Sequence, residues 1–516
     1  MFLNNIFTRL VSKGFSYIKQ VKLEVQQSKA PASEHPVLLV ELLEAPWWVL
    51  NAHVSDHPES PMAQLMRSSV RASVTTMQPA DNLRYWVSSA SLMRGVTASR
   101  HGMQFLNQTD PMAFPPLWTL AAAHGCRVGV WGTAYSHAWK DFKSESLDFY
   151  LPDKFGPDDY AHPRSVIAYQ RILRLLSRLS DQGEDVTLRR WNVRVALFRF
   201  LISRAMRMRF GTLRSLFRGD GLSLRNKHRI LISARIAFYE FVSIFTRHVP
   251  DFSTLSLGTL ASAMHLDGGY YRDAERLPPA ERVAVRADTL VGKALQELDL
   301  VIADLLRLSR ERGVTLLVVS GYGQIPAASF HAMSSRDEIW TLRDAKRLLE
   351  HLGVDVPFTR LPSMFPCTTL SFYNNKDRNK VMAALQRICR PGDQGLLFYV
   401  EPGDRCLSVK PVPDEQAMEK GRVTSYSPGG LPTQMQAWDI GVRRRQRQAL
   451  TGEHALGGVL IVHQSGIDPS GEQMAAIPEE SIARFVMGLL DVSPPDYMCA
   501  MTPVLENLLK ILRQNL

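Results

Sequence analysis

The feature that most constrains the fold is a short apolar run that leads into a glycine-containing turn. Residues 314–319 read Val-Thr-Leu-Leu-Val-Val, and residues 320–324 read Ser-Gly-Tyr-Gly-Gln. A short β-branched run bounded by glycines predicts a strand buried on both faces, as in a parallel sheet. Open α/β sheets bind ligands beyond the carboxyl ends of such strands. We therefore expect residues 320–324 to lie where any chemistry would occur.

Other segments repeat this pattern of a short apolar run bounded by turn residues. A helix closed by Gly125 lies between two of the strands. The predicted strands are residues 37–43, 127–132, 251–258 and 457–462. This alternation of strands and helices predicts an α/β fold with a doubly wound, mainly parallel central sheet.

Composition limits the class of protein. The chain has 516 residues, of which 45% are hydrophobic and 22% charged, as in soluble globular proteins. Its five cysteines are scattered, without a CxxC pair, which argues against a disulfide framework or a structural zinc site. We find no secretory signal pattern, and no apolar run of about 18 residues that would predict a membrane span. We expect a cytoplasmic protein, or one peripheral at the inner face of a membrane.

The positive charge is concentrated in one segment. Residues 165–250 hold 17 Lys and Arg against 5 Asp and Glu, a local charge of +12, whereas the whole chain carries +11. Apolar residues at helical spacing predict a helical insertion that caps the carboxyl edge of the sheet. Its arginines, Arg204, Arg207 and Arg209 among them, predict either a solvated face or a site for an anionic partner, such as lipid headgroups or a phosphorylated glycan. We expect no specific nucleic acid, since no such motif occurs, and a protein partner is not excluded.

The order of these segments predicts a core that two insertions interrupt. Residues 338–349 predict a helix, residues 398–409 a hairpin around Pro402-Gly403, and residues 411–445 a loop. The predicted organisation is an amphipathic N-terminal helix and linker (1–36), a first core segment (37–160), the basic insertion (161–250), a second core segment (251–330), a second, capping insertion (331–450) and a third core segment (451–516). The N-terminal helix either docks on the body or lies on a membrane surface.

Several motifs resemble the alkaline phosphatase superfamily in its phosphodiesterase/nucleotide pyrophosphatase branch. The late strand of that family ends in Ser-Asp-His-Gly, whose Asp and His bind a metal, and here Gly321 and Tyr322 stand in their places. The first strand of the family ends in Asp-Gly-x-x-Trp, and Glu44 falls on the Asp. An Asp-x-x-x-His motif places His265 on the His and Ala261 on the lost Asp. The resemblance also implies a metal-binding His at the position of His454, before the last strand.

The position of the family's nucleophile carries a tyrosine in this chain. In the family, a Thr or Ser lies ten residues before a glycine that matches Gly95, and this spacing falls on Tyr85. A phenol with a pKa near 10 is a weak nucleophile at neutral pH without an activating metal or base. The serines nearby are interpreted as cap and first-turn residues of a helix, and His101 as a structural residue. They are Ser88, Ser89 and Ser91.

Counting ligand positions gives the expected function. One metal site would keep His265 and His454, whereas the other would keep only Glu44, and two-metal phosphoryl transfer needs both ions about 4 Å apart. We therefore expect no cofactor, or at most a single, weakly held zinc ion with a third ligand such as Asp267. The predicted function is a catalytically degenerate protein that binds or scaffolds an anionic, phosphorylated or sulfated ligand or an envelope partner. The alternative is a hydrolase or transferase of phosphate or sulfate esters with an altered, single-metal site.

Overall fold

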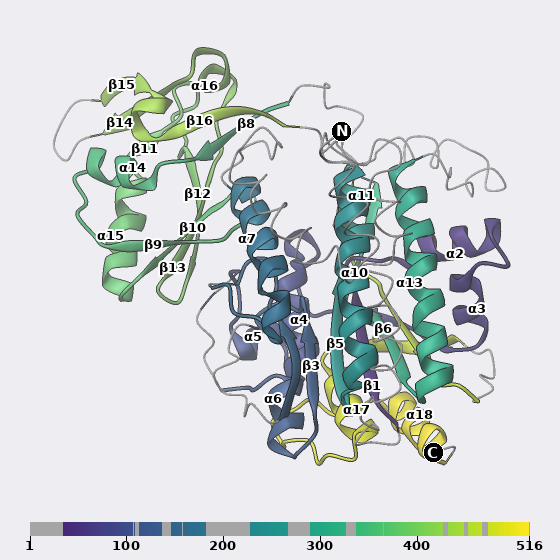
Figure 1. Cartoon of the computed structure of the whole chain (residues 1–516). Coiled ribbons are helices and arrows are strands. Elements are labelled where there is room, and N and C mark those ends of the chain that lie inside the picture. The colour runs from purple at the N-terminus through teal and green to yellow at the C-terminus, as the bar shows by residue number, and fades with distance from the viewer. Residues whose placement is uncertain are drawn as a thin grey trace, which may run out of the picture.

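An eight-stranded sheet forms the centre of the molecule, with the strand order β19-β2-β18-β6-β1-β5-β3-β4 (Figure 1). Strand β18 is antiparallel to both of its neighbours, and all other pairs are parallel. The strands are β1 (Val37–Leu42), β2 (Val70–Thr75), β3 (Val128–Trp131), β4 (Leu147–Leu151), β5 (Phe252–Leu257), β6 (Thr315–Ser320), β18 (Gly458–His463) and β19 (Gln473–Pro478). The predicted fold class, a doubly wound and mainly parallel sheet, is confirmed.

This arrangement comes from a computed structural model. It describes residues 35–106, 108, 113–136, 146–156, 158–181, 228–266, 289–326, 337–364, 366–426, 432–447, 452–466 and 473–514. Among these residues, no helix combines the length and the apolar character needed to cross a membrane. The predicted N-terminal helix lies outside the described residues.

Helices cover both faces of the sheet, which explains why the central strands are apolar throughout. Every residue of β1 is buried: Leu38 and Val40 pack into the core on one face, and Leu39 into the core on the other. The first core is closed by α2 (Trp47–Asp56), α3 (Pro61–Arg67), α7 (Ile167–Asp181), α10 (His228–His248), α11 (Thr259–Leu266) and α13 (Leu290–Arg312). The second is closed by α4 (Tyr85–Arg94), α6 (Leu117–Ala123), α17 (Ser481–Leu489) and α18 (Pro503–Gln514).

The described residues of the basic insertion belong to the helical layer of the sheet. Phe241 and Phe245 of α10 are fully buried against Phe149 of β4. The expectation of a cap over the carboxyl edge is therefore wrong for α10, because its aromatic side chains bury themselves on a sheet face. Arg204, Arg207 and Arg209 lie outside the described residues.

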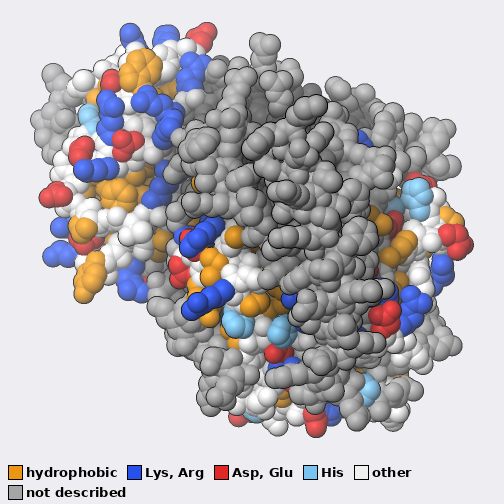
Figure 2. All heavy atoms as spheres, in the orientation of Figure 1, with side chains coloured by type: hydrophobic (Ala, Val, Ile, Leu, Met, Phe, Trp, Pro, Cys, Tyr) orange, Lys and Arg blue, Asp and Glu red, His pale blue; other side chains and the backbone are white. Residues whose placement is uncertain are grey.

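A second unit, residues 337–447, has a hydrophobic core of its own (Figure 1, upper left). Its elements are β8 (Asp337–Leu342), α14 (Ala345–His351), β9 (Phe358–Leu361), β10 (Thr368–Phe372), α15 (Asn375–Leu385), β11 (Ile388–Cys389), β12 (Phe398–Gly403), β13 (Cys406–Pro411), α16 (Glu415–Lys420), β14 (Arg422–Tyr426), β15 (Pro432–Gln436) and β16 (Val442–Arg447). Figure 2 shows Lys and Arg side chains over its visible face, with Asp and Glu between them.

Two local predictions for this unit are wrong, and one is confirmed. The hairpin around Gly403 exists as β12 and β13. The helix predicted for residues 338–349 begins only at Ala345, because the preceding residues form β8 and pair with β16. The loop predicted for residues 411–445 contains α16 and three strands. Strand β8 pairs with β16, about a hundred residues away, whereas β14 pairs with the neighbouring β15 and with β11.

Candidate metal centre

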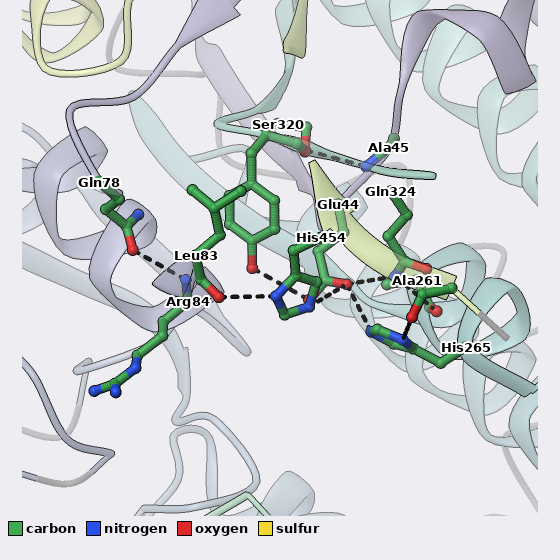
Figure 3. Close-up of polar contacts among 12 residues, drawn as sticks. Glu44, Ala45, Gln78, Leu83, Arg84, Ala261, His265, Ser320, Gln324 and His454 are labelled. Atoms are coloured by element: carbon green, nitrogen blue, oxygen red, sulfur yellow. Dashed lines mark hydrogen bonds and ion pairs between the residues drawn. The ribbon is translucent and has the colours of Figure 1, made fainter. Parts of the chain in front are cut away.

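Three side chains from separate elements meet beyond the carboxyl ends of the central strands. Glu44 follows β1, His265 lies on α11, and His454 lies on β17 (Gly452–Ala455). Glu44 Oε2 is 3.0 Å from His265 Nε2 and 3.3 Å from His454 Nε2. Figure 3 shows both rings pointing toward this carboxylate. One ligand atom from each residue lies within 4.8 Å of the others, the one such group of at least three His, Cys, Asp or Glu side chains among the described residues.

The backbone fixes the orientation of both imidazoles. His265 Nδ1 is 3.1 Å from the Gly452 carbonyl oxygen, and His454 Nδ1 is 2.8 Å from that of Leu83. A carbonyl oxygen only accepts hydrogen bonds, so each Nδ1 must carry the proton and donate it. In the neutral ring, Nε2 is then left with a lone pair that faces Glu44. Metal-binding histidines usually have this arrangement, with the other ring nitrogen bonded to a carbonyl or a carboxylate.

The electrostatics of the cluster favour an ionised carboxylate. Burial raises the pKa of the Glu44 carboxyl, but contacts with His265 and His454 outweigh burial and hold that pKa well below its ordinary value. Burial lowers the pKa of His454, and the contact with Glu44 outweighs it, so this pKa is raised. The ionised Glu44 carboxylate is thus a buried negative charge, which needs a cation or a protonated histidine beside it.

The backbone at Glu44 is in a left-handed conformation, with φ = 58°. Such a conformation in a residue other than glycine costs on the order of 1–3 kcal/mol and persists only where the surroundings impose it. Here the amide of the next residue, Ala45, donates to Ser320 Oγ over 3.1 Å. Gln324 Nε2, fully buried on β7 (Gly323–Pro326), donates to Glu44 Oε2 and to the carbonyl of Ala261. The strained turn directs the carboxylate toward the two histidines.

The donor set fits a divalent metal ion. Two imidazole nitrogens and one carboxylate are a ligand set that catalytic zinc sites use, with a fourth position left open. His454 Nε2 is buried and faces the Glu44 carboxylate at 3.3 Å, so the neutral ring turns its lone pair toward the same point as His265. The structure thus brings Glu44 to the two histidines, whereas the sequence pattern assigned it to a separate site. With three ligand groups in place, zinc binding is expected to be stronger than the two histidines alone implied. Asp267 lies outside the described residues.

The space beyond Gly321 is already filled. A Cβ atom at this position would lie 1.9 Å from Ser88 Oγ and 2.3 Å from Glu479 Oε2. Ser88 Oγ donates to Glu479 Oε2, and Thr76 Oγ1 donates to Glu479 Oε1 over 2.7 Å. Burial raises the pKa of Glu479 to about 8, since the hydrogen bonds from these hydroxyls compensate only in part. At neutral pH a mostly protonated carboxyl therefore lies next to the place where a side chain at 321 would stand.

Tyr322 and Tyr85 bring phenol groups to this region, and phenols are not among the usual ligands of zinc. The Tyr322 hydroxyl donates to Glu44 Oε1 over 3.4 Å, and its ring packs against that of His454. Tyr85 is half-buried at the first position of α4. Burial, with the charges of Asp153 and Glu44, raises the pKa of Tyr85 well above its ordinary value. A phenol in these surroundings is a poorer nucleophile than one in water.

The residues around this centre match the sequence expectations in part. His101 has the predicted structural surroundings: its Nδ1 accepts from the Met103 amide, and its Nε2 lies 3.0 Å from Ser91 Oγ. The N-cap of α4 is Arg84, so none of the three serines caps the helix, and of the predicted first-turn residues only Ser88 lies in its first turn. Sequence reasoning missed Gln324 and Glu479. Gln324 lies two residues after Tyr322, so in an extended segment both side chains point to the same face, and this spacing could have identified it. Nothing in the sequence links Glu479 to Gly321.

The structure thus defines an α/β protein with a Glu/His/His centre at the carboxyl edge of its sheet. No protein-family model matches the chain, and no curated protein matches it. Among solved structures, murine ectonucleotide pyrophosphatase/phosphodiesterase 5 is similar at 12% identity and a TM-score of 0.41, covering 92% of this chain and 100% of that one. The human protein of the same name matches at 10% identity and 0.41, covering 92% and 99%. The alkaline phosphatase PafA matches at 12% identity and 0.43, covering 92% and 99%.

These solved proteins are members of the alkaline phosphatase superfamily, the family that the sequence motifs resemble. Because these TM-scores are below 0.5, the strand order of the sheet, and not the similarity to these structures, is the evidence for the fold.

Proposed function

We propose that this chain is a catalytically degenerate phosphodiesterase-like protein that holds one zinc ion and binds an anionic ligand there. The observation that carries the proposal is the convergence of His265, His454 and Glu44 around a single point. Zinc bound to these groups would supply a Lewis-acid centre with an open position for a phosphate or sulfate oxygen. The Leu83 and Gly452 carbonyls would hold the two rings in the binding tautomer.

The packing at Gly321 supports a single ion rather than two. A second cation would need ligands from this turn, yet Ser88 and Glu479 occupy the space of a side chain at Gly321. Two-metal phosphoryl transfer clamps the attacking and the leaving oxygen between a pair of ions. With one ion and with Tyr85 at the nucleophile position, we infer binding without group transfer.

One observation favours a second candidate, a single-zinc hydrolase of phosphate or sulfate esters. Three protein ligands with an open position are also the ligand set of mononuclear zinc hydrolases, in which bound water is the nucleophile. This candidate needs no contribution from Tyr85. The two functions therefore differ in turnover and agree in metal content.

The test combines metal analysis with ligand titration. Untagged protein is dialysed, loaded with zinc, and analysed for metal per chain, with His265→Ala as the site variant and His124→Ala, an exposed histidine, as the control. We expect one zinc per chain, lost only in His265→Ala. The loaded protein is then titrated calorimetrically with inorganic phosphate and sulfate and incubated with phosphodiester and phosphomonoester substrates. Binding without turnover supports the proposal.

Two results would overturn it. Less than roughly a tenth of a zinc ion per chain in the loaded parent would refute the proposed metal centre, because a site with three ligands should bind zinc. Hydrolysis that disappears in His265→Ala and persists in Tyr85→Phe would establish the single-zinc hydrolase instead.

The anionic partner of the basic insertion is a separate proposal. The local charge of residues 165–250 supports an anionic lipid or glycan surface as the partner. This partner would be separate from the ligand at Glu44, which would be a small anion. Vesicle flotation, described below, tests this proposal independently of zinc.

A further inference from the structure

Residues 83–85 lie between the candidate metal centre and the second unit. The Leu83 carbonyl accepts the hydrogen bond from His454 Nδ1. The next residue, Arg84, forms an ion pair through its guanidinium with Glu401 on β12 of the second unit. Figure 3 shows the Leu83 carbonyl directed at His454 and the Arg84 side chain directed away from it. Adjacent residues thus hold one metal-centre histidine and one acidic side chain of the second unit.

Several contacts fix Arg84 in this position. Its backbone amide donates to Gln78 Oε1 over 3.0 Å, and its guanidinium donates to the Gln104 carbonyl over 3.1 Å. The guanidinium also lies 5.9 Å from the centre of the Trp86 ring and 6.0 Å from that of Phe105. The side chains of Arg84 and Glu401 are only 18% and 22% exposed, so the pair is shielded from water and from salt more than a surface pair would be.

The second unit also packs on the same segment by shape. Gly403, at the end of β12, lies so close to the main body that a Cβ atom there would be 2.3 Å from Phe105 Cε2. The hairpin of β12 and β13 therefore contacts the residues that surround Arg84. A displacement of this hairpin would move Glu401, and Arg84 is joined by a single peptide bond to the residue whose carbonyl orients His454.

We propose that Glu401 is a positioning residue for the metal centre: the second unit, docked through the Glu401–Arg84 pair, holds the Leu83 carbonyl against His454. This inference rests on the proposed metal-binding function. Loss of the pair removes one of the contacts that hold Arg84, so the peptide between residues 83 and 84 is held less firmly and the Leu83 carbonyl fixes the His454 tautomer less well. Loss of a direct outer-shell partner typically lowers metal affinity 10- to 100-fold, and an effect one step further out is expected to be about 3- to 10-fold.

The test is a double-mutant cycle on the intact chain. Glu401→Gln, Arg84→Met and the double variant are compared with Glu419→Gln, an exposed acidic residue of the same unit, as the control. Co²⁺ replaces zinc as the probe, because its absorption spectrum reports ligand geometry as well as occupancy. We expect a rise of about 3- to 10-fold in the Co²⁺ dissociation constant and an altered spectrum in each single variant, with the double variant no worse than either.

Amide hydrogen exchange of the metal-free proteins tests the positioning role of Glu401 independently of metal binding. In Glu401→Gln, exchange is expected to rise in peptides covering residues 83–86 and also residues 452–456, where His454 lies. A rise in the first peptide alone, or unchanged Co²⁺ affinity with raised exchange, would overturn the positioning role. Failure of the parent to bind Co²⁺ would remove the proposed function, while the exchange data would still decide whether Glu401 is coupled to the His454 strand.

Discussion

Replacing Glu479 by glutamine should make the protein less sensitive to alkaline pH. Glu479 is buried, with 1% of its surface exposed, and both of its oxygens accept hydrogen bonds from hydroxyl groups. Glutamine has the same shape, and it can accept from Thr76 and donate to Ser88. The substitution therefore removes an ionisable group while keeping the packing against Gly321.

The magnitude follows from the raised pKa. The carboxyl has an ordinary pKa of 4.5 and one of about 8 in the folded protein, where burial is the main cause. A proton held more tightly in the folded state stabilises it fully below pH 4.5, and this stability is lost as the pH rises to about 8. At about 1.36 kcal/mol for each pH unit, the interval corresponds to about 5 kcal/mol in the free energy of unfolding. Glu41, whose pKa burial raises to about 7, adds a loss of the same sign.

Urea unfolding followed by tryptophan fluorescence at about pH 5, 7 and 9 measures this difference. The parent should lose stability across this range, and Glu479→Gln should lose less, by about 4 kcal/mol, because the range begins above the ordinary pKa. Glu506→Gln, an exposed residue on α18, is the control and should follow the parent. Equal pH dependence of parent and Glu479→Gln would refute the reasoning, because it would mean that Glu479 is already ionised in the folded state.

Three further outcomes are expected. The Gly321→Asp/Tyr322→His variant should melt below the parent in calorimetry, because its new Cβ would meet Ser88 Oγ at 1.9 Å; a melt that micromolar zinc raises well above the parent's would contradict this. Tyr85→Phe should leave any turnover of phosphodiester substrates within about twofold of the parent, and loss of turnover would identify the phenol as a nucleophile. Residues 165–250 should carry the protein to anionic vesicles in flotation at low salt and release it above about 0.3 M salt; no flotation at low salt would reduce them to a solvated surface.

The sheet could be predicted from the sequence because its central strands have a strong local signal. Strand β1 is apolar at nearly every position, and Glu44 follows it directly, so the carboxyl edge was identifiable without any tertiary information. His265 and His454 were found through the motifs that resemble the alkaline phosphatase superfamily. Their grouping with Glu44 was not, because spacing says nothing about the left-handed turn that directs this carboxylate.

The second unit was predicted less well, and the reason is physical. Residues 338–342 include Ile, Trp and Thr, which suit a strand, and they pair with residues 442–446, about a hundred positions away, whereas the helix begins only at Ala345. Likewise, the Leu83 carbonyl that orients His454 belongs to the backbone and has no signature in the residue type. Interactions of this kind become visible only when the chain is folded, since local propensity is a weak guide where tertiary pairing competes.

Packing, as well as the absence of a side chain, excludes at Gly321 the ligand that the sequence resemblance implied for this position. Gly321 lets Ser88 and Glu479 approach to distances that no side chain at this position would tolerate. In turn, the uncharged form of Glu479 needs no cation, because its proton can be donated to Ser88 Oγ while its other oxygen accepts from Thr76. An aspartate at 321 would therefore clash first and bring a second carboxylate beside the first, with an unfavourable charge if no ion binds. A two-metal centre would require changes at Gly321, Ser88 and Glu479 together with new ligands at Tyr322 and Ala261, whereas the Glu/His/His group at Glu44 involves none of the first three.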